Sequence, residues 1–230
     1  MSTADKTKTG MSPSTLMKSA LAIFNALQTR SPYALFSTWH LARQWPFLPP
    51  YLSAMLPPPM SISGPTTEWT PELIEVRRPG SGETICSFLR RMQHDTTLLA
   101  THIQAPLSQI LSRLGEEAPA VLAASTRQAF VWDVNMGMTQ GFNPSSSPES
   151  ETIGTTKTGL EVTSRHDWPD CALFWNAFLL DSHNMFFIAT WDTAQMNAAE
   201  IEEHCEGVAG VLRKLVRERN WERTVEDVFF

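Results

Sequence analysis

Histidine is the side chain here that is best suited to acid–base chemistry, and its distribution is sparse. Six histidines are scattered along the chain and no two are adjacent. His166 is followed by Asp170 four residues later, an H-x-x-x-D spacing. An imidazole can take a proton from an attacking amine or alcohol when it lies within hydrogen-bond reach. The alternative is a plain loop histidine, because Pro169 makes this segment a turn ahead of a strand.

The chain shows no other catalytic motif. Its three cysteines, Cys86, Cys171 and Cys205, lie far apart without a C-x-x-C pair, so neither a zinc site nor a disulfide framework is indicated. This cysteine usage fits a reducing, cytoplasmic setting. No G-x-S-x-G elbow occurs, and Gly80-Ser81-Gly82 lacks the downstream glycine and lysine of a phosphate-binding loop. We expect no bound cofactor and no metal.

Composition indicates a folded protein with one sizeable core. Apolar residues make up 42% of the 230 residues and charged residues 18%. The formal net charge of −6 argues against nucleic acid or an anionic membrane as partner. The basic pairs at 77–78 and 90–91 are interpreted as solvated surface. No segment approaches the roughly 20 apolar residues of a membrane span.

Local signals predict one domain over 12–230, after a flexible tail at 1–11. Helices are expected from Pro13, capped by Ser12, from Thr84 onward, and over 107–114. Strands are expected at 33–39, 73–77 and 128–136. Residues 43–65 are rich in proline and are expected to form neither a helix nor a central strand. Residues 137–159 are expected to form a long mobile loop.

The clearest stretch runs from residue 171 to 216. Residues 171–180 are apolar on both faces except for Asn176, which predicts a strand inside a sheet covered on both sides. A second strand follows at 185–191, and Asn197 with Glu200 predicts a capping box for a final amphipathic helix. Strands interleaved with helices indicate an α/β sandwich, a mixed β-sheet with helices packed on it.

Several motifs in a shared order resemble the late part of the condensation domains of nonribosomal peptide synthetases. The segment Ser125-Thr126-Arg127-Gln128-Ala129-Phe130 resembles the family's Ser-Arg pair and Phe-Gln, which lead into a core strand. His102-Ile103-Gln104-Ala105-Pro106-Leu107 is similar to its His-Gln-Asp-x-Pro-Phe element. Trp45-Pro46-Phe47 and Gly64-Pro65-Thr66 resemble the fungal versions, and residues 171–216 resemble the closing hairpin and helix.

This resemblance covers residues 12–225 and implies one lobe of a chloramphenicol-acetyltransferase-like fold. Such domains have two α/β lobes with a tunnel between them, and phosphopantetheine-tethered substrates on carrier proteins enter from opposite faces. An amine attacks a thioester and an amide forms. The family's HHxxxDG motif belongs to the N-terminal lobe and is missing from this chain. The resemblance therefore implies a C-terminal lobe alone, with no catalytic residue expected.

The resemblance also gives meaning to individual residues. Arg43 and Arg127 are similar to family arginines near the tunnel or the lobe interface, and a structural ion pair is the alternative. Asn176 and Asp133 either face the tunnel or bond within the sheet. His166 and Asp170 match the HxxxD pattern of related acyltransferases, in which histidine is the general base and aspartate forms a structural salt bridge.

Three functions remain open at this stage. The first is a half-domain that complements a missing N-terminal lobe or a synthetase in fungal-type secondary metabolism, or that self-associates through an apolar patch. The second is a small acyltransferase that uses His166 and Asp170. The third is a module that docks a carrier protein without chemistry.

Overall fold

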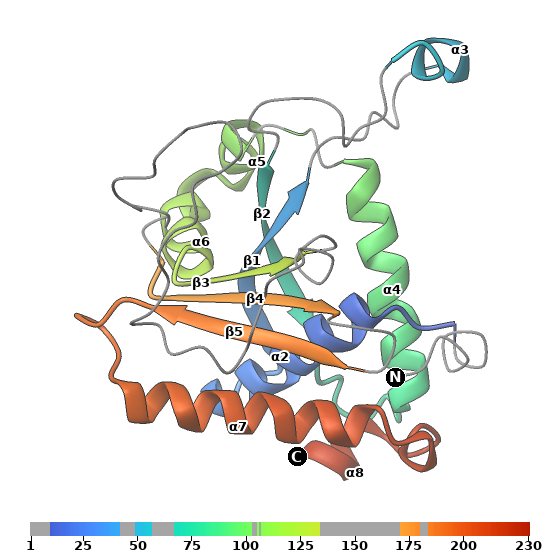
Figure 1. The fold of residues 1–230 in the computed structure, drawn as a ribbon, viewed down its shortest axis with the longest axis vertical. Helices are drawn as coiled ribbons and strands as arrows, with labels where there is room; N and C mark the ends of the chain where they lie inside the picture. The colour runs from blue at the N-terminus through green and yellow to red at the C-terminus, as the bar shows by residue number, and fades with distance from the viewer. Residues whose placement is uncertain are drawn as a thin grey trace, which may run out of the picture.

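The computed structural model describes residues 10–41, 49–56, 67–102, 105, 107–133, 171–179 and 184–230. The protein is α/β, a mixed five-stranded sheet with helices packed on it, as predicted (Figure 1). The helices and strands are α2 (Pro13–Thr29), β1 (Tyr33–Leu41), α3 (Pro50–Ser53), β2 (Thr67–Glu75), α4 (Ile85–Thr101), α5 (Leu107–Leu114), α6 (Ala118–Ser125), β3 (Gln128–Trp132), β4 (Leu173–Leu179), β5 (Met185–Trp191), α7 (Ala198–Leu215) and α8 (Val225–Phe229). None of these helices combines the length and the apolar character that crossing a membrane requires.

The sheet has the strand order β2-β1-β3-β4-β5. β1, β3 and β4 run parallel, whereas β2 and β5 form the two edges and run antiparallel to their neighbours. β4 lies between β3 and β5, so the apolar stretch at 171–180 does form an interior strand. Its residues 173–175, 177 and 178 are buried.

The predicted helix starts are confirmed by their caps. The Ser12 side chain accepts a hydrogen bond from the Thr15 N–H, and Pro13 opens α2. Thr84 caps α4 through the Ser87 N–H. Asn197 and Glu200 form the complete capping box of α7, with bonds of 3.0 and 2.8 Å.

The second strand differs from its prediction because it is an edge strand. β2 begins at Thr67, six residues before the expected start, and includes Pro71. Proline lacks an N–H donor, which excludes it from the centre of a sheet but not from an edge. The outer side of this edge is also covered, because the Arg91 guanidinium donates to the Glu75 carbonyl at 2.8 Å.

Other features also differ from the expectations. Residues 50–53 of the proline-rich segment form the one-turn helix α3, because proline is tolerated in a first helical turn. Residues 118–125 form α6, which lacks the apolar periodicity that predicts a helix. β3 ends at Trp132 rather than at residue 136. Met11 is already buried in the core, ahead of the expected boundary at residue 12. The loop predicted over 137–159 lies outside the described residues.

The core is organised around α2, which packs between the sheet and the helices α4 and α7. Figure 1 shows α7 running alongside β5, with α4 at the β2 side of the fold. Gly207 of α7 permits a close approach to α2, since a Cβ atom there would lie 2.3 Å from Phe24 Cε2. The described α2 therefore makes contacts on most of its circumference, and only five of its 17 residues are not buried.

The two faces of the sheet differ in character. We call the face that packs on α2 the α2 face, and the other the opposite face. Because side chains alternate along a strand, the core residues Phe36, Phe130 and Trp175 place their neighbours in sequence on the opposite face. That face carries Leu35, Ser37, Trp39, Trp69, Pro71, Leu73, Ala129, Val131, Asp133, Phe174, Asn176 and Phe178.

An ion pair is buried on the α2 face. Lys18 Nζ of α2 lies 2.5 Å from Glu72 Oε2 of β2, and the two side chains are 3% and 5% exposed. Burial alone would raise the pKa of the Glu72 carboxyl. The His40 imidazole, 3.8 Å away, and the Lys18 ammonium outweigh burial and lower this pKa from 4.5 to about 2.

Replacing Lys18 by methionine is expected to lower the free energy of unfolding by about 3–5 kcal/mol, because it leaves a buried carboxylate without its cation. Urea denaturation measures this loss. Arg78→Met is the matched control, since it breaks the exposed Arg78–Glu75 pair and should cost less than about 1 kcal/mol. Equal losses in the two variants would contradict the assignment.

The ion pair also predicts how stability depends on pH. Since the pKa of Glu72 is lower in the folded state, its contribution is complete above about pH 4.5 and is lost as the pH falls towards 2. That contribution is about 3 kcal/mol. Unfolding free energies measured between pH 6 and pH 2.5 should fall more steeply for the wild type than for Glu72→Gln. Parallel curves would show that this carboxyl carries no such linkage.

Candidate functional site

The connections of β1 mark one end of the sheet as the place to look for a site. β1 leads into β2 on one side, whereas the next parallel strand, β3, pairs with β1 on its other side. In open α/β sheets, ligands bind beyond the carboxyl ends of the strands at such a change of direction. These ends carry Trp39 of β1 and Asp133 directly after β3, and the antiparallel β2 brings Trp69 to the same end.

Three aromatic side chains form a strip across this part of the opposite face. The ring of Trp39 lies 6.0 Å from that of Trp69 and 5.2 Å, edge to face, from that of Phe174. These distances are in the favourable range for aromatic pairs. We call Trp39, Trp69 and Phe174 the aromatic strip. It links β2, β1 and β4 over the opposite face.

Four buried polar atoms without hydrogen-bond partners lie in or beside the aromatic strip. They are Trp39 Nε1, Trp69 Nε1, Ser37 Oγ and Asn176 Oδ1. Among the described residues nine such atoms occur, and the other five lie on the α2 side of the sheet or in α2 itself. A buried polar atom without a partner costs about 1–3 kcal/mol, so four of them on one face indicate a surface that another group completes.

Two of the sequence-predicted residues meet on this face. Val131 is in register with Asn176, and the Asp133 N–H donates to the Ala177 carbonyl at 2.9 Å. Asp133 and Asn176 therefore share the opposite face near the carboxyl ends of β3 and β4. Arg127 lies at the other end of β3, about 20 Å from Asp133 along the strand. It is exposed, and it lines a groove of about 810 Å³ with Tyr33 and His204.

The remaining predicted residues, Arg43, His166 and Asp170, lie outside the described residues. Of the histidines that the structure does describe, His40 faces Glu72 on the α2 face, His94 and His204 belong to helices, and His102 directly follows α4. The described part of the opposite face thus offers indole N–H donors, an amide and a hydroxyl beside apolar rings. This set can hold an amide group or a peptide backbone, and Asp133 adds a carboxylate to the same face.

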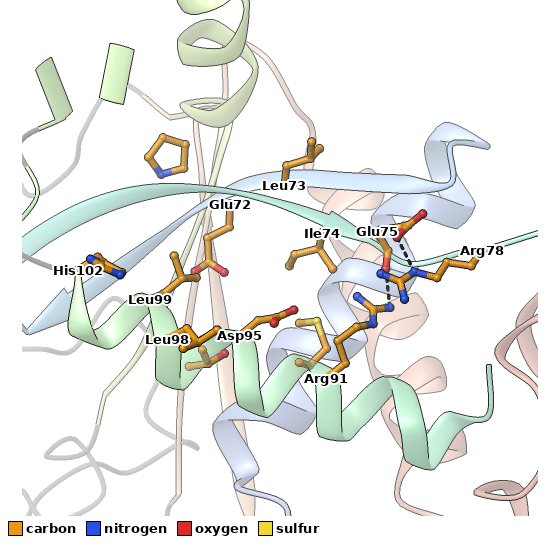
Figure 2. Close-up of a pocket in the computed structure, with 13 residues that line it drawn as sticks. Glu72, Leu73, Ile74, Glu75, Arg78, Arg91, Asp95, Leu98, Leu99 and His102 are labelled. Carbon is orange, nitrogen blue, oxygen red and sulfur yellow. Dashed lines mark hydrogen bonds and ion pairs between the residues drawn. The ribbon is translucent and has the colours of Figure 1, made fainter. Parts of the chain in front are cut away.

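A second cavity, of about 570 Å³, lies between β2 and α4 (Figure 2). At one end, Arg78 binds the Glu75 carboxylate, while Arg91 binds Glu83 with two bonds of 2.9 Å. Arg91 is only 18% exposed, so half of the pair at 90–91 is not solvated surface as expected. At the other end, His102 caps α4 by donating its backbone N–H to Leu99. Because Glu75 neutralises Arg78 and Glu83 neutralises Arg91, we interpret this cavity as structural.

The sequence did not single out the aromatic strip. Trp39 and Trp69 lie in two different strands and carry no motif, and their neighbourhood depends on the β1–β2 register that pairs them. The excess of tryptophan, eight residues against two tyrosines, is a signal of core as well as interface positions and does not locate such a surface.

Comparison with solved structures identifies the fold. A structure named CT matches with a TM-score of 0.64 at 14% identity, over 96% of this chain and 44% of that one. The first condensation domain of the CDA synthetase matches with a TM-score of 0.60 at 11% identity, over 97% and 43%. The cyclization-docking bidomain EpoB from Sorangium cellulosum gives 0.58 at 15% identity, over 96% and 40%. No family model and no curated protein matches the sequence.

The chain therefore has a condensation-domain-like fold of the chloramphenicol-acetyltransferase type, as the sequence resemblance implied. It spans less than half the length of these solved chains.

The unpartnered Asn176 generates a prediction about stability. Asn176→Leu removes a buried acceptor that has no partner, so the free energy of unfolding should rise by about 1 kcal/mol or more. Asn220→Leu is the matched control. Asn220 is buried and donates to the Lys214 carbonyl at 2.9 Å, so its loss should destabilise by about 1–2 kcal/mol. Denaturant titrations compare the two, and a clear loss of stability in Asn176→Leu would refute the assignment.

Proposed function

We propose that this chain is the C-terminal lobe of a fungal-type condensation-like domain and that it completes a cleft whose catalytic histidines belong to another polypeptide segment. It acts as a non-catalytic or complementing part of amide-bond formation in nonribosomal peptide biosynthesis. The proposal depends on the matched length: the alignment covers nearly all of this chain but only 40–44% of each of the three structural neighbours.

The opposite face supports this reading. Its aromatic strip and unpartnered polar atoms are what one wall of a cleft offers before its other wall docks. The absence of HHxxxDG from the sequence is consistent with chemistry supplied from elsewhere. In this proposal the substrates are acyl groups on the phosphopantetheine arm of a carrier protein. Asp133 and Asn176 contact the substrate or the second lobe, and the compartment is the cytoplasm.

The test begins with the coding sequence beside this one. A segment with HHxxxDG upstream of it is the expected partner. Produced together, the two should co-elute at their summed mass and should form amide product from aminoacyl phosphopantetheine thioesters, whereas this chain alone should form none. Co-production without association would overturn the proposal.

Substitutions on the opposite face and on α4 distinguish specific docking from non-specific binding. Trp39→Phe keeps the aromatic ring but removes the buried indole N–H, so affinity for the partner should fall about tenfold. Leu98→Ala, an exposed residue of α4 beside the second cavity, should leave affinity unchanged. Binding measured by calorimetry would contradict the docking face if both variants bind like the wild type.

The same assay tests the rival acyltransferase. If the chain alone transfers an acyl group from a thioester and His166→Ala abolishes this, the chemistry resides here and the complementing role is wrong. Saturable binding of a loaded carrier protein without product, and without a second lobe, would instead indicate a docking module.

A further inference from the structure

The two edge strands, β2 and β5, differ in how their outer sides are protected against pairing with another strand. β2 contains Pro71, and the Arg91 guanidinium binds its outward Glu75 carbonyl. β5, with the sequence Met-Phe-Phe-Ile-Ala-Thr-Trp, contains neither a charged residue nor a proline. Proteins protect free edges with such residues, because an exposed row of backbone groups invites pairing with another strand. Within the described ranges, β4 is the one strand that pairs with β5.

The register shows which backbone groups of β5 face outward. The Asp192 N–H donates to the Ala172 carbonyl at 3.0 Å, which makes 172 and 192 a hydrogen-bonded pair. In an antiparallel ladder these pairs alternate, so Phe186, Ile188 and Thr190 also bond to β4. The N–H and C=O groups of Met185, Phe187, Ala189 and Trp191 therefore point away from the sheet.

These outward groups suit a second copy of the same strand. If two copies of β5 run antiparallel about a two-fold axis at Ile188, Phe187 lies opposite Ala189 and Met185 lies opposite Trp191. All four outward residues then occupy hydrogen-bonded positions, and every outward N–H and C=O meets a partner. If the register were shifted by one residue, outward backbone groups of one copy would lie opposite inward groups of the other. The alternation of hydrogen-bonded pairs therefore favours the register centred on Ile188 over the registers one residue to either side.

Side chains on this edge are self-complementary as well. The large Phe187 faces the small Ala189, and the Met185 thioether faces the Trp191 indole, a favourable sulfur–aromatic contact. No charge is present to repel the second copy. All seven residues of β5 are only partly buried, so each has surface left to cover.

We propose that β5 is a homodimer interface, in which two chains join their sheets through antiparallel β5–β5 pairing centred on Ile188. The interface is isologous, as two-fold symmetry requires. It uses the edge of the sheet and leaves the aromatic strip for the second lobe, so it stands independently of the proposed function.

The first test removes one outward N–H. Ala189→Pro deletes a donor that β4 does not use, whereas Ala189→Val keeps the donor and adds comparable bulk. Light scattering should give twice 25.8 kDa for the wild type and for Ala189→Val, and 25.8 kDa for Ala189→Pro. Circular dichroism establishes that each variant is folded. A monomeric wild type, or a dimeric Ala189→Pro, would overturn the proposal.

The second test uses the symmetry axis. Ile188 faces its own copy at a Cα separation of about 4.5 Å, so Ile188→Lys and Ile188→Glu should each be monomeric. Mixing the two should restore a dimer that native mass spectrometry identifies as a one-to-one heterodimer. Two dimeric single variants, or a mixture that stays monomeric, would exclude this register.

The outcomes also separate this inference from the complementing role. A β5 edge covered by the second lobe would give a monomeric wild type whose affinity for that lobe falls in Ala189→Pro. An edge covered by another segment of this chain would give a monomer at every concentration. Either result overturns the homodimer while leaving the test of the aromatic strip intact.

Discussion

The burial of α2 is the constraint on which the rest of the fold depends. This helix packs against the sheet on one side and against α4 and α7 on the others. A helix buried almost all round is expected to be mostly apolar, and Lys18 is the one charged residue that α2 carries into the core. The Lys18–Glu72 pair resolves this conflict by joining α2 to the edge strand β2, and Thr96 of α4 lies within 3.4 Å of the same ammonium. One charge thus links three elements, and it fixes how the helix sits on the sheet.

The consequence is a sheet with two unequal faces. The α2 face holds the main hydrophobic core, in which Leu16, Phe36 and Trp175 are each no more than 1% exposed. The opposite face presents the aromatic strip, and beside it lie four of the nine buried polar atoms that lack a hydrogen-bond partner among the described residues. Buried polar atoms without partners lower the stability of a fold, so stability alone does not explain their presence on the opposite face. In the complementing role that we propose, the α2 face would supply stability and the opposite face would supply the docking surface.

Local chemistry explains what the sequence predicted well. Caps at Ser12, Thr84 and Asn197, and the apolar run of β4, are signals carried by a few neighbouring residues, and the structure confirms them. The class of fold followed from the alternation of strands and helices. The start of β2 was missed because Pro71 is a breaker anywhere except at an edge, and strand order cannot be deduced from local patterns.

The candidate site was only partly predictable for the same reason. Asp133 and Asn176 stood out as polar residues in apolar strands, and the register brings them to one face. Trp39, Trp69 and Phe174 become neighbours only through the pairing of β1 with β2 and the order of β1, β3 and β4. The burial of Lys18 was equally hidden, since a lysine in an amphipathic helix is ordinarily solvated.

The glycine at position 207 allows α7 to pack closely against α2. At Gly207 even a methyl group would collide with the Phe24 ring of α2. Phe24 lies six residues from Lys18, about 9 Å along the same rigid helix. Any residue that enlarges position 207 must therefore displace the Phe24 ring or separate α7 from α2, the helix that also carries Lys18. The absence of one carbon atom on α7 thus allows the close helix packing beside which the Lys18–Glu72 pair is buried.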